Sequence, residues 1–393
     1  MHARKIRPGI EIIASVHWER RLFDSLIPLP DGTSYNAYVI RGSEGTALLD
    51  ATDPALRGDL LNELEEVENI DYIVSHHSEQ DHSGVIPDVM ARYPDAALVC
   101  SRKAEDLLAS HLDIDRERLK VVEDGETLSL GNKTLQFIYT PWVHWPETMI
   151  TYIPEDRCVF SCDFFGSHLA TTDLFVTDKA GVYEAAKRYY AEIMMPFRAV
   201  IRKNLDKIDR LDFDIIAPSH GPVYDDPAFI LDAYRDWVSQ KVKNEVVLPY
   251  ISMHGSTETM VKHLIDALAS REVKVHAFDL AVTDIGKLAI TLVDAATLIV
   301  ATPTVHAGPH PAVYYASHLA NLLRPKVKYA ALTGSYGWHS KAAEQISALI
   351  PNLKVEVLGS VFHKGAPDNE TFTELDNLAE SVARAHAADD EIE

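Results

Sequence analysis

Four residues that can bind metal ions lie close together in one short polar segment. His77, Glu79, Asp81 and His82 follow the predicted strand 71–75. A single histidine in a loop is more often an ordinary polar residue, but two imidazoles and two carboxylates at this spacing are typical of a metal site. If the segment is extended, residues 77, 79 and 81 project to one side, while His82 turns toward a second region. Two neighbouring metal ions are therefore the expected occupants.

Three further candidate ligands lie downstream, each at the end of an apolar, strand-like run. They are His144, Asp163 and His220. Side chains at strand ends are held by a rigid scaffold and remain open to substrate. Taken singly, His144 and His220 would be ordinary loop residues about half the time, and Asp163 would be a turn residue more often than a ligand. Together with the first segment they complete a site of seven residues.

The pattern His-x-Glu-x-Asp-His, followed by His, Asp and His at these separations, resembles the flavodiiron proteins, the A-type flavoproteins that include rubredoxin:oxygen oxidoreductases and F420H2 oxidases. Hydrolases of the metallo-β-lactamase fold carry a second histidine where Glu79 stands and usually bind zinc. A carboxylate at that position gives a harder, more oxygen-rich site that suits iron. The resemblance implies two irons with one shared ligand: His77, Glu79 and His144 on one iron, Asp81, His82 and His220 on the other, and Asp163 as the bridge.

The composition of the chain limits the classes of function. The 393 residues carry a formal net charge of −22, which argues against nucleic acid as a partner because phosphate binding needs clustered Lys and Arg. The three cysteines, Cys100, Cys158 and Cys162, have neither disulfide nor zinc-ribbon spacing. With no apolar stretch long enough to span a membrane and no signal sequence, we expect a soluble cytoplasmic protein with reduced thiols. The acidic tail 387–393 is expected to be frayed.

The elements that must position the seven ligands fall in the first 244 residues. Short strands separated by turns and helices predict a β-rich layered domain. We expect strands at 10–16, 35–40, 46–50, 71–75 and 97–100, helices at 56–66, 85–92 and 103–112, two hairpins at 127–140 and 149–161, a long helical stretch at 182–205 broken near Pro196, and a strand at 214–217. An αββα sandwich accounts for this order, and the resemblance implies the same metallo-β-lactamase-like fold. A helix at 227–243 is expected to connect this domain to the rest of the chain.

From residue 245 onward, strands alternate with helices, which is the signature of a doubly wound parallel sheet. Strands are expected at 245–251, 274–279, 297–301, 328–333 and 354–360, with helices beginning near 259, 284, 312 and 340 and a last helix at 370–386. Five such strands indicate a flavodoxin-like domain. The chain is thus predicted to combine α+β and α/β domains: a diiron domain at 1–244 and an FMN domain at 245–393.

Three loops at strand ends of the second domain could form a flavin pocket. Hydroxyls and free N–H groups before a helix can hold a phosphate, and the absence of Gly-x-Gly-x-x-Gly favours a mononucleotide such as FMN over NAD. Each loop alone is a weak signal, but three on successive strands are a strong one, and they resemble the flavin loops of the family. The candidate residues are Ser252, Met253, His254, Gly255, Ser256 and Thr257; Pro303, Thr304, Val305, His306 and Ala307; and Ser335, Tyr336, Gly337 and Trp338.

Three positions depart from the family pattern. His306-Ala307 stands where an Asn-Asn pair is usual, and His339 follows Trp338 where Gly-Trp-Ser-Gly is usual. Phe23-Asp24-Ser25 replaces a Phe-His-Gly near the iron pocket. Other polar candidates near the irons are His168 and one of Tyr189 and Tyr190. With Asp163, His168 and Tyr189 are the candidate catalytic residues.

The resemblance implies an oxidoreductase in which FMN passes electrons to a non-haem diiron centre that reduces O₂ to water, NO to N₂O, or both. One alternative is a zinc-type metallo-β-lactamase-fold hydrolase with an accessory flavodoxin domain. Another is an electron carrier with a vestigial metal domain, which leaves the complete ligand set unexplained. Metal analysis separates these hypotheses, since the first requires about two irons and one FMN per chain.

The resemblance also implies partners. A separate electron donor, either rubredoxin or a reduced F420-type deazaflavin, is expected to supply the flavin. A head-to-tail homodimer, possibly paired into a dimer of dimers, would bring the flavin of one subunit to the diiron site of the other.

Overall fold

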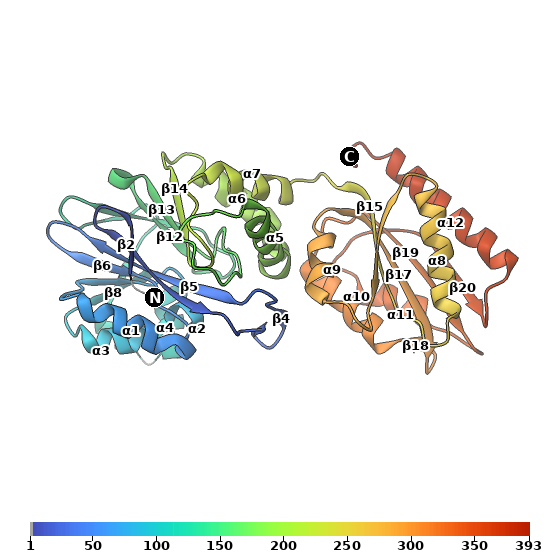
Figure 1. Cartoon of the computed structure of the whole chain (residues 1–393), viewed down its shortest axis with the longest axis horizontal. Helices are drawn as coiled ribbons and strands as arrows, with labels where there is room; N and C mark the ends of the chain where they lie inside the picture. The colour runs from blue at the N-terminus through green and yellow to red at the C-terminus, as the bar shows by residue number, and fades with distance from the viewer. Residues whose placement is uncertain (1–2, 113) are drawn as a thin grey trace. The chain divides into compact units, whose positions relative to one another are not determined.

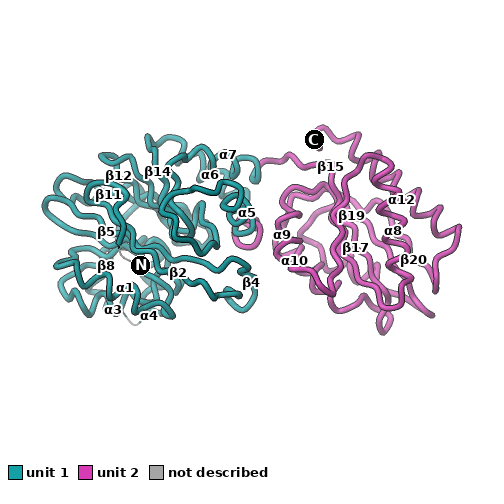
Figure 2. The backbone as a smooth tube through the Cα atoms, viewed as in Figure 1, with its two compact units in different colours: residues 1–189, 197–238 teal, residues 190–196, 239–393 magenta. Residues whose placement is uncertain are grey.

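The computed structural model describes residues 3–112 and 114–393. The chain divides into two compact units, as Figure 2 shows. The first comprises Met1–Tyr189 and Phe197–Val238, and the second comprises Tyr190–Pro196 and Ser239–Glu393. The assignment of diiron and FMN functions to residues 1–244 and 245–393 stays a prediction.

The first unit contains two large sheets and a small hairpin. The larger sheet has the strand order β1-β2-β5-β6-β7-β8-β9, antiparallel up to β6 and parallel from there on. Its strands are β1 (Arg4–Arg7), β2 (Ile10–His17), β5 (Thr33–Arg41), β6 (Thr46–Leu49), β7 (Tyr72–Val74), β8 (Ala97–Ser101) and β9 (Leu119–Val122). The hairpin, β3 (Leu22–Phe23) with β4 (Ile27–Pro28), was not expected from the sequence.

The second sheet of this unit has the order β10-β11-β12-β13-β14. Its strands are β10 (Thr127–Ser129), β11 (Thr134–Tyr139), β12 (Met149–Ile153), β13 (Cys158–Cys162) and β14 (Ile215–Pro218). The first four form the two predicted hairpins, and β14 returns from far along the chain to pair with β13 in parallel. The helices are α1 (Arg57–Glu63), α2 (Gln80–Ser83), α3 (Ile86–Arg92), α4 (Ala104–Leu112), α5 (Lys179–Tyr189), α6 (Arg198–Ile208) and α7 (Pro227–Trp237).

Two apolar cores hold these layers together. One lies between the sheets and includes Tyr38 and Leu49 from the first sheet and Phe137 and Phe160 from the second. The other lies between the first sheet and helices α1, α3 and α4. Alternate residues of β5 and β6 face the two cores, as expected for strands buried on both faces. With α5–α7 beside the second sheet (Figure 1), the predicted αββα sandwich is confirmed.

The second unit is a parallel sheet in the order β16-β15-β17-β19-β20, with β18 paired to β17. The strands are β15 (Lys243–Tyr250), β16 (Lys274–Asp279), β17 (Ala295–Val305), β18 (Gly308–Pro309), β19 (Tyr329–Tyr336) and β20 (Glu356–Lys364). The helices are α8 (Ser256–Ala269), α9 (Ile285–Leu292), α10 (Pro311–Leu323), α11 (Ala342–Leu349) and α12 (Asn369–Ala387). Helices α8 and α12 pack on one face, and α9, α10 and α11 pack on the other (Figure 1). This is the predicted flavodoxin-like, doubly wound arrangement.

Two expectations about the connection between the predicted domains are wrong. The helix expected at 227–243 ends at Trp237, and Lys243 already belongs to strand β15. The tail is not frayed. The Val242 N–H donates to the Glu391 carbonyl, the Asn244 N–H donates to the Glu393 carbonyl, and the Glu393 N–H donates to the Val242 carbonyl, each at 2.9 Å. The connection is therefore extended because it pairs with the tail as a short β-bridge.

Several shorter turns complete the chain. The helical stretch expected at 182–205 is interrupted by a π-turn at Tyr190–Met194 and a 3₁₀ turn at Met195–Phe197, so the break predicted near Pro196 is confirmed.

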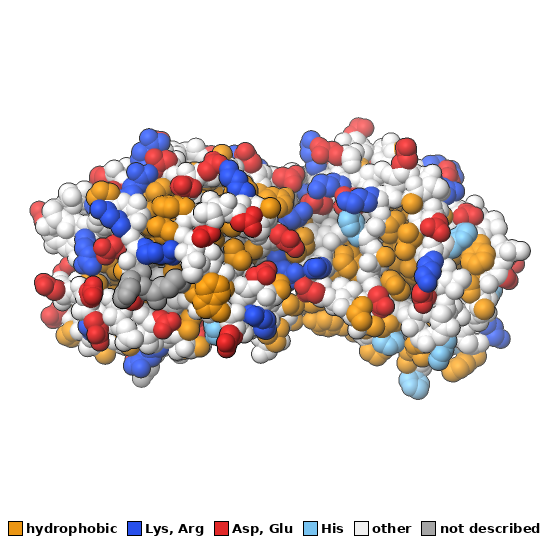
Figure 3. Space-filling view, in the orientation of Figure 1, with side chains coloured by type: hydrophobic (Ala, Val, Ile, Leu, Met, Phe, Trp, Pro, Cys, Tyr) orange, Lys and Arg blue, Asp and Glu red, His pale blue; other side chains and the backbone are white. Residues whose placement is uncertain are grey.

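Acidic and basic side chains are mixed on the face of the two units that Figure 3 displays. Within residues 3–112 and 114–393, none of the helices combines the length and apolar character needed to cross a membrane.

Candidate metal centre and flavin pocket

The segment after β7 does not continue as an extended strand. Residues 80–83 form the helical turn α2, because the His82 and Ser83 N–H groups both donate to the Glu79 carbonyl. A Cβ at Gly84 would lie 2.5 Å from the Gln80 carbonyl oxygen, so only glycine closes this turn. Asp81 is therefore rotated away from His77 and Glu79. The expectation that residues 77, 79 and 81 share one side is wrong.

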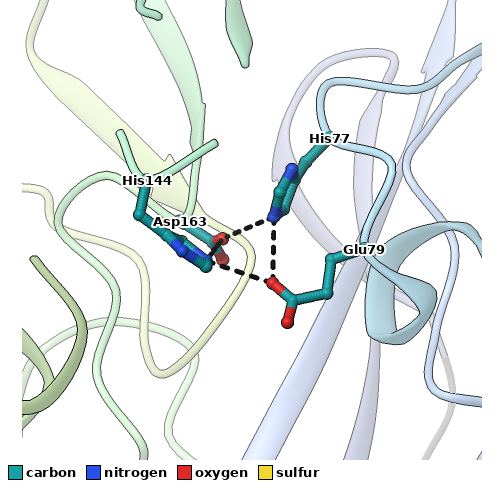
Figure 4. Close-up of side chains that lie close together, drawn as sticks. All are labelled: His77, Glu79, His144 and Asp163. Atoms are coloured by element: carbon teal, nitrogen blue, oxygen red, sulfur yellow. Dashed lines mark hydrogen bonds and ion pairs between the residues drawn. The ribbon is translucent and has the colours of Figure 1, made fainter. Parts of the chain in front are cut away.

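Four of the seven candidate ligands form a first donor group, shown in Figure 4. The Nε2 atoms of His77 and His144 lie 3.0 and 3.1 Å from Glu79 Oε2. The same two nitrogens lie 3.5 and 3.3 Å from Asp163 Oδ2. Two imidazole nitrogens and two carboxylate oxygens thus converge from three separate loops.

The other three candidate ligands form a second donor group. His82 Nε2 and His220 Nε2 lie 3.3 and 3.4 Å from Asp81 Oδ2. They lie 3.0 and 3.2 Å from Asp163 Oδ1. One oxygen of Asp163 therefore faces the first pair of histidines and the other faces the second pair. This is the arrangement of a carboxylate that can bridge two metal ions.

The donor groups fit a pair of metal ions. Asp81 Oδ1 and Oδ2, His82 Nε2 and Asp163 Oδ1 are buried and have no hydrogen-bond partner of suitable geometry among the residues that the structure describes. Buried polar atoms are normally satisfied, so four such atoms within the two donor groups have the chemistry of a metal-binding site. Each group offers two imidazoles and carboxylate oxygens, a mixed nitrogen and oxygen set that suits iron.

Two of the candidate-ligand imidazoles have a hydrogen-bonding partner at Nδ1, on the side of the ring away from the donor group. His77 Nδ1 lies 2.9 Å from Glu147 Oε1, which also accepts from Ser78 N–H and Ser78 Oγ. His220 Nδ1 donates to the Ser34 carbonyl at 2.8 Å. A partner at Nδ1 leaves Nε2 free to bind a metal. Glu147 was not among the residues predicted from the sequence, although a carboxylate three residues after His144 was a signal for it.

Asp50 connects the loops that carry the ligands. Its carboxylate accepts from the His76 N–H and lies 2.7 Å from His76 Nδ1, and Ser219 Oγ donates to it at 3.2 Å. His76 and Ser219 precede ligand positions 77 and 220. Asp50 also has donor atoms within 4.8 Å of those of His82 and Cys162. Because its carboxylate is already occupied by these contacts, Asp50 acts as a positioning residue and not as a further ligand.

The electrostatics of the metal-free site favour imidazolium–carboxylate pairs. Burial opposes charge on His144 and His220, but the close contacts with the carboxylates of Asp163 and its neighbours outweigh it and raise the pKa of His144 to about 9 and that of His220 to about 10. Burial also disfavours charge on Asp163, yet the surrounding histidines hold the pKa of Asp163 well below its usual range. A metal ion must therefore displace protons from these imidazoles.

Both other candidate catalytic residues lie beside the second donor group. The ring centroids of His168 and Tyr189 are 5.1 and 5.7 Å from that of His220. Burial lowers the pKa of His168 well below its ordinary value and raises the pKa of Tyr189 well above its own. Both side chains are therefore neutral at pH 7. His168 Nδ1 is 2.9 Å from Thr33 Oγ1.

Asp24 lies beside the carboxylates Glu79 and Asp81 of the metal centre. It lines a cavity of about 460 Å³ together with Glu79 and Asp81. Partial burial, followed by the negative charges of Glu79 and Asp81, raises the pKa of Asp24 to about 6. The carboxylate that stands in place of the usual histidine thus lies next to the ligands.

The three predicted flavin loops meet at the carboxyl edge of the parallel sheet. Ten of the fifteen candidate residues line one pocket: Ser252, Met253, His254, Ser256, Thr257, Pro303, Thr304, Ser335, Tyr336 and Gly337. Gly365, which sequence analysis missed, also lines it. Gly255 has a left-handed conformation (φ 86°) and caps α8. The Glu258 N–H donates to Ser252 Oγ at 3.2 Å, which leaves the Ser256 and Thr257 N–H groups for a phosphate. The hydroxyls, helix start and aromatic ring fit FMN.

The other four candidates do not line this pocket. Val305 is the last residue of β17, and the two-residue loop that follows it, before β18, consists of His306 and Ala307 with φ of 47° and 65°. Two positive φ angles define a type I′ turn, which the usual Asn-Asn pair adopts with less strain. Trp338, 83% exposed, lines a neighbouring cavity with His339 and Ser340.

Comparison with known proteins agrees with this description. A family model described as ODP family beta lactamase matches residues 33–221. A nitric oxide reductase from Moorella thermoacetica is 34% identical, covering 90% of both chains. A coenzyme F420H2 oxidase from Methanothermobacter marburgensis is 32% identical, covering 79% of this chain and 80% of that protein. The structure of rubredoxin oxygen:oxidoreductase from Desulfovibrio gigas matches with a TM-score of 0.94 and 28% identity, covering 98% of both chains.

The fold and the two sites define an oxidoreductase with a metallo-β-lactamase-like domain and a flavodoxin-like domain. The hydrolase alternative is not favoured. More particularly, the chain belongs to the flavodiiron proteins, the A-type flavoproteins. FMN and a diiron centre are the cofactors that this membership implies, and the residues described above fit both.

Proposed function

We propose that the protein reduces O₂ to water, NO to N₂O, or both, at a diiron centre held by His77, Glu79, His144, Asp81, His82, His220 and the bridging Asp163. The observation that carries the proposal is the orientation of Asp163, whose two oxygens face separate histidine pairs at 3.0–3.5 Å. When bound, two adjacent irons and a flavin supply the electrons that these reactions consume.

The protein side chains set the metal positions and orient the imidazole rings that would bind them. Asp163 sets the separation of the two metal positions, and Glu147 and the Ser34 carbonyl fix the rings of His77 and His220. Both proposed reactions consume protons. His168 and Tyr189, neutral and next to His220, are the proposed hydrogen-bonding groups on that side of the site. In the second unit, the residues lining the pocket are proposed to bind FMN.

Activity with defined cofactor content tests the proposal. Protein containing about two irons and one FMN per chain should consume O₂ or NO when supplied with a reduced donor, and the Asp163→Asn variant should not. Oxygen electrode traces and N₂O gas chromatography measure the two reactions. Zinc in place of iron, with hydrolysis of a thioester, would instead support the hydrolase.

The electron donor is proposed to be a separate protein or cofactor. The names of similar proteins include both a rubredoxin-dependent and an F420H2-dependent enzyme, which supports these two candidates. Full-rate O₂ consumption with NADH alone would contradict a requirement for either donor. A cytoplasmic location is part of the same proposal, supported by three buried, unpaired cysteines.

We further propose a head-to-tail homodimer in which the flavin of one subunit serves the diiron centre of the other. Mixing a variant altered at Ser256 and Thr257 with the Asp163→Asn variant tests it. After dissociation and reassembly, each mixed dimer would contain one intact pair of sites, so about half the activity should return. Inactive mixed dimers with the designed cofactor content would favour transfer within one chain.

A further inference from the structure

The cavity beside the metal centre touches both donor groups. Its wall includes Glu79, from the group with His77 and His144, and Asp81, from the group with His82 and His220. Its volume of about 460 Å³ is far larger than a diatomic molecule needs. Both metal positions are thus reached from one cavity, through a carboxylate in each case.

The wall is acidic in a way that a neutral substrate does not explain. Besides the candidate ligands Glu79 and Asp81, its titratable side chains are Asp24, Asp53, His111 and one arginine, Arg20. Arg20 is paired with Asp53 at 2.6 Å and also donates to the Tyr35 hydroxyl. No ion pair with Asp24 is found in the described part of the chain, and Asp24 is exposed while lying beside Glu79. Carboxylates do not attract O₂ or NO, but they concentrate divalent cations and raise their rates of association.

The candidate ligands differ in whether they line the cavity: Glu79 and Asp81 do, whereas His144, whose side chain is 16% exposed, does not. Asp81 is only 4% exposed, and in the described residues neither of its oxygens has a hydrogen-bond partner. His77, His82 and His220 are 0–1% exposed and are not part of the wall. Among the candidate ligands, a cation in the cavity therefore meets carboxylate oxygens before imidazoles; the imidazole that lines the wall, His111, belongs to neither donor group. Oxygen ligands exchange readily on a hard, hydrated ion such as Fe²⁺, so this order suits loading.

We propose that this cavity is the route by which Fe²⁺ loads the metal centre, with Asp24 as the outermost docking carboxylate that passes the ion to Glu79 and Asp81. The inference rests on the proposed diiron function. It assigns to Asp24 a role in the rate of loading and none in the final affinity, because Asp24 belongs to neither donor group.

Loading of metal-free, full-length protein tests the proposal. Asp24→Asn is the suitable variant because Asp24 has a left-handed backbone (φ 49°) that asparagine tolerates. Glu68→Gln, which removes the same charge from an exposed position outside the cavity, is the matched control. Fe²⁺ alone is added anaerobically at pH 7.5, samples are quenched with a chromogenic chelator, and protein-bound iron is followed with time and at the end point.

Asp24→Asn should slow loading roughly three- to tenfold at low salt, while the end point stays at about two irons per chain. The difference should shrink as NaCl is raised, because salt screens the steering. Glu68→Gln should load like the wild type. Equal rates for Asp24→Asn and wild type would overturn the proposal, as would equal slowing by Glu68→Gln or a lower iron end point in Asp24→Asn. Wild-type protein that takes up fewer than two irons would instead contradict the diiron function itself.

Discussion

The metal-centre side chains lie at strand ends between two sheets, most of them less than 5% exposed, whereas the flavin pocket is lined by loops at the open edge of one sheet, with Met253 51% exposed. In the first region charged side chains face one another and depend on a few fixed partners. In the flavin pocket, the start of a helix and several hydroxyl groups each supply part of the expected contacts with FMN. We therefore expect single substitutions to have large effects at the metal centre and small ones in the flavin pocket.

The largest effect is expected from Asp163→Asn. The side chain contacts four histidines, and the amide removes the negative charge that both metal positions share. Iron should fall below one per chain and turnover by more than about 100-fold, while FMN content stays near that of the wild type. Metal analysis and flavin absorbance measure both. Simultaneous loss of FMN and iron would show that the two regions are not independent.

A smaller effect is expected from Glu147→Gln, which changes a partner of a ligand and no ligand itself. The neutral amide still accepts from His77 Nδ1 but holds the imidazole less strongly. Iron affinity should fall about 10- to 100-fold. Competition with a chelator of known affinity gives the value, and an unchanged affinity would show that the orientation of His77 does not depend on Glu147.

The pH dependence of stability tests the charged pairs of the metal centre, which the flavin pocket lacks among its described lining residues. In the metal-free protein the folded-state pKa values of His144 and His220, about 9 and about 10, exceed the unfolded value of 6.5. Their stabilising contribution is complete below pH 6.5 and is lost as the pH rises through 9 to 10. The melting temperature of the metal-free protein should therefore fall by a few degrees between pH 7 and pH 10. With iron bound, the same imidazoles are already neutral, so a parallel fall in the loaded protein would argue against their ligation.

The smallest effect is expected from Thr257→Ala in the flavin pocket. Thr257 Oγ1 lies 2.8 Å from Ser335 Oγ, and one lost hydrogen bond costs about 1 kcal/mol. FMN affinity should weaken about fivefold, with iron content unchanged. Fluorescence titration of the flavin-free protein measures it. Complete loss of FMN would mean that this pocket, too, depends on a single side chain.

Much of the architecture was predictable because local patterns agree with the final structure. Alternating strands and helices after residue 245 indicated the doubly wound sheet, and strand-end residues marked the metal centre. The segment 77–82 was not predictable from alternation, since the turn at 80–83 depends on Gly84 packing against Pro54. The resemblance nevertheless assigned these ligands to the two groups in which the structure places them.

The missed features depend on contacts between distant parts of the chain. Asp50 follows strand β6, and only the folded structure brings it to His76 and Ser219. The connection before β15 resembles a helix in sequence, yet it is extended because residues 391–393 pair with it. In both cases the residues that make the contact lie far away in the sequence, so a short local segment does not contain them.

The parallel pairing of β13 with β14 has a consequence for the order of folding. Asp163 follows β13 and His220 follows β14, and these strands become neighbours only after the chain has passed through α5 and α6. The pairing closes a long loop, which is entropically costly and slow to form. We therefore expect the complete donor set to form late in folding. On this expectation iron does not direct the early steps and binds a site whose protein scaffold is already formed.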